Sequence, residues 1–163
     1  MFNRRSIQGA AIILGLALCI YLGIPPSDDT LIRRFHSNSA VQQLAALFEQ
    51  DKQPLMVNAS GDVWSGDEKI PSLPPERLDQ YRDLVRRAGA SWVGGDGAGS
   101  LTLYYPPPVL LPGLSMKSLV YAPAPPTALT DGRTDFYKFQ PDQYQWVCRP
   151  IEGNWYVCKD NED

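Results

Sequence analysis

Histidine and cysteine are scarce in this sequence: its 163 residues include one histidine, His36, and three cysteines. A closed zinc site needs about four such ligands, and a catalytic histidine needs a carboxylate and a nucleophile within reach. Neither set can be picked out around His36, which we interpret as a surface or cap-region residue of a helix. The cysteine spacings also exclude a C-x-x-C redox motif. We therefore predict no catalytic site, no metal and no cofactor from the sequence.

An excess of basic charge is also missing. The chain has 15 basic and 18 acidic residues, a net charge of −3 at pH 7. Nucleic acids and anionic lipid surfaces are bound by basic faces, so this balance argues against nucleic acid as a partner. Residues 94–100 are rich in glycine, but they lack the lysine and the following helix of a phosphate-binding loop. We interpret them as a hairpin loop.

Charge is absent altogether from one long stretch near the N-terminus, residues 6–27. Its apolar part, residues 7–24, would extend about 27 Å as an α-helix, close to the hydrocarbon thickness of a bilayer. Arginines precede this stretch and aspartates follow it, an arrangement that places the N-terminus in the cytoplasm. We predict that residues 1–27 form a cytoplasmic stub with a transmembrane anchor, and that residues 28–163 form one extracytoplasmic domain.

Two other interpretations of this segment stay open. A cleaved signal peptide needs a small-x-small site, and the candidate that ends at Gly23 begins with a tyrosine. A lipoprotein signal would place the lipid on Cys19, although Leu18 stands where a glycine or alanine is usual. All three interpretations carry the rest of the chain across a membrane.

The other two cysteines, Cys148 and Cys158, flank a predicted β-hairpin. The residues around them are rich in aromatic and β-branched side chains, which favour strands. A three-residue loop at 152–154, with Gly153 or Asn154 in the left-handed conformation, would place the two cysteines opposite each other. Outside the cytoplasm such a pair persists as a disulfide.

The proline of this hairpin gives an independent check on the register. Opposed residues alternate between hydrogen-bonded and non-hydrogen-bonded pairs, and Pro150 has no N–H to donate. With Ile151 and Trp155 as a hydrogen-bonded pair, Pro150 falls in a non-hydrogen-bonded position, and so does Cys148. Side chains are closest at such pairs, so we predict a structural disulfide between Cys148 and Cys158.

Helical spacing comes first in the domain and strand-like runs come later. Residues 28–52 are predicted to form a helix, or a helix pair that divides near residues 37–39, and a second helix is predicted to end at Gly89. Short strand-like stretches fill most of the chain from Ser91 to the hairpin. This order predicts an α+β fold with two helices packed on one mainly antiparallel sheet.

One proline-flanked apolar run, residues 104–112, is a candidate contact surface. If it is exposed, it would be a rigid extended segment suited to gripping a partner; if it is buried, it would cover a sheet edge. The residues predicted to form this partner face are Tyr104, Tyr105, Val109, Leu110 and Leu111.

Three short stretches, residues 75–82, 113–123 and 151–156, resemble a family of small bacterial envelope proteins. The resemblance implies a bacterial origin and an envelope location. Together with the predicted anchor at residues 7–24, this places the chain in the inner (cytoplasmic) membrane, with its bulk in the periplasm. It implies no known activity and no catalytic residue.

These features together predict a non-enzymatic, membrane-anchored periplasmic protein that binds another envelope protein, as an accessory or immunity-type factor. The sequence identifies neither the partner nor the oligomeric state. The alternative is a hydrolase of an envelope polymer, which would need carboxylates brought together by the fold, for instance Asp62, Asp67 and Glu68.

Overall fold

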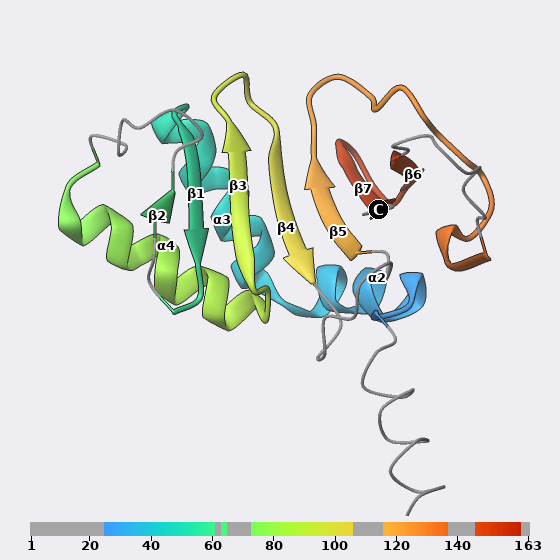
Figure 1. The fold of residues 1–163 in the computed structure, drawn as a ribbon, viewed down its shortest axis with the longest axis horizontal. Coiled ribbons are helices and arrows are strands. Elements are labelled where there is room, and N and C mark those ends of the chain that lie inside the picture. Colours follow the sequence, from blue (N-terminus) through green and yellow to red (C-terminus); the bar gives the residue numbers. More distant parts are fainter. Residues whose placement is uncertain (1–24, 61–62, 65–72, 106–115, 137–145, 161–163) are drawn as a thin grey trace, which may run out of the picture.

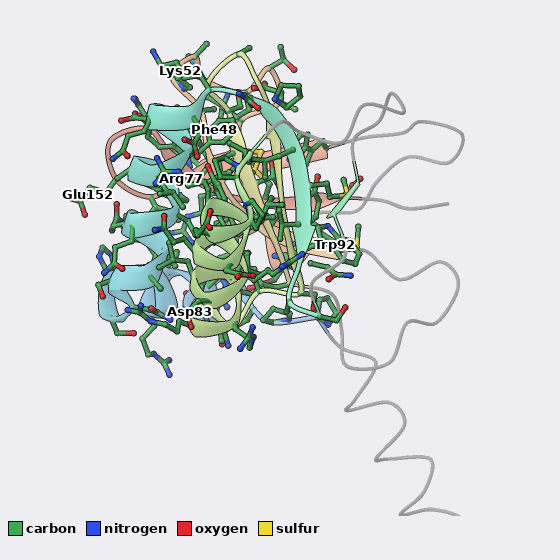
Figure 2. All side chains as sticks on the ribbon, turned by 90° about the vertical axis from the view of Figure 1, so that its left-hand side faces the viewer. Phe48, Lys52, Arg77, Asp83, Trp92 and Glu152 are labelled. Atoms are coloured by element: carbon green, nitrogen blue, oxygen red, sulfur yellow. A yellow bond between two sulfur atoms is a disulfide. The ribbon has the colours of Figure 1, made fainter. Side chains whose placement is uncertain are left out.

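A computed structural model describes residues 25–60, 63–64, 73–105, 116–136 and 146–160 of the chain. It shows an α+β domain in which helices cover one face of a single sheet, as the edge-on view in Figure 2 makes clear. None of the helices within these ranges combines the length and the apolar character needed to span a membrane. The predicted anchor at residues 7–24 and Cys19 lie outside the described residues.

Three helices within the described residues form the covering layer, where the sequence predicted two. The first predicted helix is divided at one residue, Asn38, whose extended backbone ends one helix and whose side chain accepts a hydrogen bond from the N–H of Ala40 at 3.0 Å. The Asn38 amide also donates to the carbonyl oxygen of Arg87 at 2.7 Å, which ties the break to the last turn of the third helix. The helices are α2 (Asp28–Ser37), α3 (Ser39–Asp51) and α4 (Pro75–Ala88).

In the part of the chain that the structure describes, the sheet has seven strands in the order β2-β1-β3-β4-β5-β7-β6, and each neighbouring pair is antiparallel (Figure 1). This confirms the predicted antiparallel sheet. A short 3-10 helix, η1 (Thr134–Phe136), lies in the connection between β5 and β6. The strands are β1 (Pro54–Asn58), β2 (Val63–Trp64), β3 (Trp92–Asp96), β4 (Leu101–Tyr105), β5 (Met116–Tyr121), β6 (Trp146–Pro150) and β7 (Trp155–Asp160).

The main core lies between the helices and the sheet. Alternate residues of a strand point to opposite faces, so β4 directs Leu101, Leu103 and Tyr105 into this core. Phe48 of α3 meets them from the helical layer and is fully buried (Figure 2). A smaller buried cluster that includes both cysteines lies on strands β5, β6 and β7.

The predicted disulfide and its register are confirmed. Cys148 and Cys158 are bonded, with their Cα atoms 4.1 Å apart, and the two residues are partners in the β6–β7 ladder. Gly153 supplies the left-handed residue of the turn, with φ of 56°. The backbone of Cys148 turns away from β7, because its N–H donates to Ala128 and its carbonyl accepts from Thr130, both at 2.8 Å. Cys148 is therefore in the predicted non-hydrogen-bonded position.

Replacing both cysteines by serine, in Cys148→Ser/Cys158→Ser, is expected to lower the free energy of unfolding by about 2–3 kcal/mol, because the bond closes a short loop. Chemical denaturation of the full chain, with and without reductant, measures this. Reductant should lower the stability of the wild type to that of the double variant and leave the variant unchanged. Equal stability of the oxidised wild type and the variant would contradict the stabilising role.

Candidate functional site

The sheet face opposite the helices is hollowed into a groove of about 480 Å³. Strands β3, β4 and β5, the segment that follows β5 and the first residue of β6 line it. The volume lies within the range of about 300–1,000 Å³ that is usual for ligand pockets. This groove is the candidate functional site.

Strand alternation explains which side chains reach the groove. On β4, Thr102 and Tyr104 point into it, while Leu101 and Leu103 point into the core. Gly94 of β3 lies directly opposite Thr102 in the ladder. Because glycine has no side chain, it leaves the groove deeper at this point. A Cβ atom at Gly94 would have the Tyr104 ring as its nearest neighbour, at an ordinary contact distance of 3.5 Å.

Two aromatic residues give the groove its binding character. Trp146 is 38% exposed and, with Leu129, is one of two large apolar side chains that are exposed among the described residues. Tyr104 is half-buried and its ring centre lies 5.4 Å from that of Trp92, which lies on the sheet face away from the helices (Figure 2). Aromatic side chains that combine an apolar body with a polar atom are favoured at binding surfaces.

Asp96 is the one charged residue among the described residues that line the groove. Its carboxylate accepts the backbone N–H groups of Ala98 at 2.8 Å and Ser100 at 3.0 Å. Burial acts to raise the pKa of Asp96, but the hydrogen bonds from Ser100 and Ala98 outweigh it and hold the pKa below the usual value. Asp96 is therefore ionised at neutral pH and organises the β3–β4 turn, so it is not suited to act as a general acid.

The structure separates the residues of the predicted partner face. Tyr104 lines the groove, whereas Tyr105 is only 3% exposed and packs in the core, with the Arg34 guanidinium 5.0 Å from its ring centre. Burial raises the pKa of Tyr105 to about 12. Neighbouring residues of a strand face opposite ways, so these two tyrosines cannot belong to one surface. The other three, Val109, Leu110 and Leu111, lie outside the described residues.

The remaining sequence candidates lie elsewhere. Residues 97–100 form the β3–β4 turn, as predicted, with Gly97 and Gly99 at positive φ, whereas residues 94–96 belong to β3 and not to the predicted loop. His36 is an exposed residue of α2, with its Nδ1 atom 3.9 Å from the Glu152 carboxylate, which is also exposed. Such a surface pair contributes about 0–1 kcal/mol. The carboxylates at positions 62, 67 and 68 lie outside the described residues.

Sequence reasoning missed two features. Trp146 was interpreted only as part of a strand, and nothing in its spacing indicates that it lies on the wall of a groove. The second is a buried charged cluster around Lys117, which is 2% exposed and contacts the carboxylates of Asp28 and Asp135. A lysine in a strand with no other charged residue is the signal that could have indicated it.

Neither a protein-family model, nor a curated protein, nor a solved structure matches the chain. The resemblance to envelope proteins therefore stays a prediction.

Proposed function

We propose that this protein is a non-enzymatic, membrane-anchored periplasmic protein whose groove binds a segment of another envelope protein, as an accessory or immunity-type factor. The observation that carries the proposal is the exposed Trp146 at the wall of an open groove that also presents Tyr104. Residues 7–24 would hold the chain in the inner membrane, and the domain would meet its partner on the periplasmic side.

The lining of the groove indicates what it would hold. Trp146 and Tyr104 offer apolar surface to an apolar or aromatic side chain, and Thr102 offers a hydroxyl group for a backbone hydrogen bond. Asp96 places a negative charge at the end of the groove where the β3–β4 turn lies. A partner segment with an apolar anchor next to a basic residue would complement this arrangement.

Two groove variants test the proposal in a pull-down of the tagged full-length protein from its own cell envelope. Trp146→Ala removes an aromatic anchor, and Gly94→Val fills the floor with a β-branched residue that suits a strand. Each is expected to reduce capture of a stoichiometric protein partner at least about tenfold, the first because it removes an aromatic hot-spot side chain and the second because it blocks the groove.

The matched control is Glu152→Ala, on the helix side of the molecule (Figure 2), which should capture the partner as the wild type does. Circular dichroism should show the same fold in all variants. The proposal would be abandoned if the wild type captured no partner above background, or if both folded groove variants bound as well as the wild type.

A further inference from the structure

The buried cluster around Lys117 surrounds one amine with three oxygen-bearing side chains. The lysine comes from β5, and its Nζ atom contacts the Asp28 carboxylate, the Thr134 hydroxyl and, at 2.9 Å, the Asp135 carboxylate. Asp28 begins α2, and the other two belong to η1. Lys117 is 2% exposed, while Asp28 and Thr134 are fully buried. Water is therefore excluded from the contact between the amine and the Asp28 carboxyl group.

Each oxygen of the Asp28 carboxyl group is held by Thr134. The Thr134 backbone N–H donates to Oδ2 and its hydroxyl donates to Oδ1, both at 2.6 Å. Asp135 lies against the same pair, because its Oδ1 atom accepts the backbone N–H of Asp28 at 3.0 Å as well as the lysine. Arg133 donates two hydrogen bonds to the other oxygen of Asp135, at 3.1 and 2.8 Å.

This arrangement brings together the parts of an amide condensation. An amine and a carboxyl group held in contact react as if at very high concentration. Asp135 touches the amine and can accept its proton, and the Thr134 N–H is placed to stabilise negative charge on Oδ2 in a tetrahedral intermediate.

We propose that Lys117 and Asp28 form an intramolecular isopeptide bond. The Nζ–Cγ bond forms and the Cγ–Oδ1 bond breaks. Nζ loses two protons: Asp135 takes one, the Thr134 hydroxyl, which contacts both Nζ and Oδ1, relays the other, and both are delivered to Oδ1, which leaves as water. Ammonium and carboxylate thus become amide and water, with no oxidant, reductant or other reactant. This modification does not depend on the function proposed for the groove.

The bond would join the first helix of the domain to the middle of the sheet. Asp28 and Lys117 are 89 residues apart, so the amide would close a long loop, and such cross-links restrict the unfolded chain most strongly. In a protein anchored through the residues before α2, a pulling force would enter the domain at this helix. The cross-link would transfer that force directly to β5.

The mass of the purified full-length protein, measured after reduction of its disulfide, tests the proposal. The expected mass is lower than that of the sequence by one water, and digestion should yield a branched peptide that joins the segments containing Asp28 and Lys117. Lys159→Arg, which changes the lysine paired with Lys117 across β5 and β7, should show the same deficit. Lys117→Arg should have its full mass.

Asp135→Asn tests whether Asp135 acts as a base or only packs against Lys117, because it keeps the shape of the side chain but removes the carboxylate. If this variant folds by circular dichroism, it should be recovered at full mass. A folded Asp135→Asn protein that has lost water as completely as the wild type would overturn the role of Asp135. A wild-type protein at full mass would overturn the cross-link itself, whatever the variants do.

Discussion

Lys117→Met is expected to lower the free energy of unfolding by about 3–5 kcal/mol, because it leaves buried carboxylate groups without their cation. Asp28 is fully buried, and Asp135 is also partly shielded from water. Arg133 still pairs with Asp135 at 2.8 Å and, like Lys159, attracts Asp28, but it is the Lys117 amine that lies against the Asp28 carboxylate. The loss is measured by chemical denaturation at neutral pH.

The control for this variant is Lys159→Met, at the position directly opposite Lys117 in the β5–β7 ladder. Burial, and then repulsion from Lys117, lower the pKa of Lys159. Removing this charge relieves repulsion between two lysines, so the variant should change stability by less than about 1 kcal/mol. The same substitution at two paired lysines would then lower the free energy of unfolding by amounts that differ severalfold. The change in side-chain shape is the same at both positions, so it cannot explain the difference.

A double variant shows whether charge causes the loss. In Lys117→Met/Asp28→Asn, the buried carboxylate is neutralised along with its cation, so much of the stability lost in Lys117→Met should return. If the wild type carries the amide, Lys117→Met also removes that cross-link, and Asp28→Asn then restores only the part of the loss that comes from the buried charge. A double variant less stable than Lys117→Met would contradict the charge explanation.

The hairpin was predictable from sequence because its determinants are local. A proline, a loop glycine and the alternation of paired positions fix the register within eleven residues, and the cysteines follow from it. The division of the first helix is also local, since Asn38 both ends α2 and caps α3. Neither conclusion needed knowledge of the distant parts of the chain.

The Lys117 cluster could not be predicted for the opposite reason. Its contacts join Asp28 to residues 89 and 106 positions away. In sequence, Asp28 is fully explained as an acidic residue in the first turn of a helix, where it interacts well with the helix dipole. Because this local role accounts for Asp28, nothing in the sequence gives a reason to expect its contacts with Lys117 and Thr134. Trp146 is a similar case, because the alternation of a strand does not show which face of the sheet is left uncovered by helices.

The close approach of α3 to β3 leads to the second large expected effect. Gly95→Ala should lower the free energy of unfolding by about 1–3 kcal/mol, because the core has no room for one more methyl group. A Cβ atom there would lie 2.1 Å from Cε2 of Phe48 and 2.5 Å from its Cζ atom. Phe48 is fully buried, so its ring cannot swing into solvent to make room. Chemical denaturation measures the loss.

The neighbouring glycine provides the matched control. Gly94→Ala makes the same chemical change one residue earlier on β3, but its Cβ atom points into the groove, with the nearest atom at 3.5 Å. Its effect on stability should be less than about 0.5 kcal/mol, because removing a glycine from a strand interior is slightly favourable. Phe48→Leu should restore part of the stability of Gly95→Ala, since a smaller side chain makes room for the new methyl group. Equal costs for the two glycine variants would mean that Phe48 does not pack against Gly95, and the two faces of β3 would have to be reassigned.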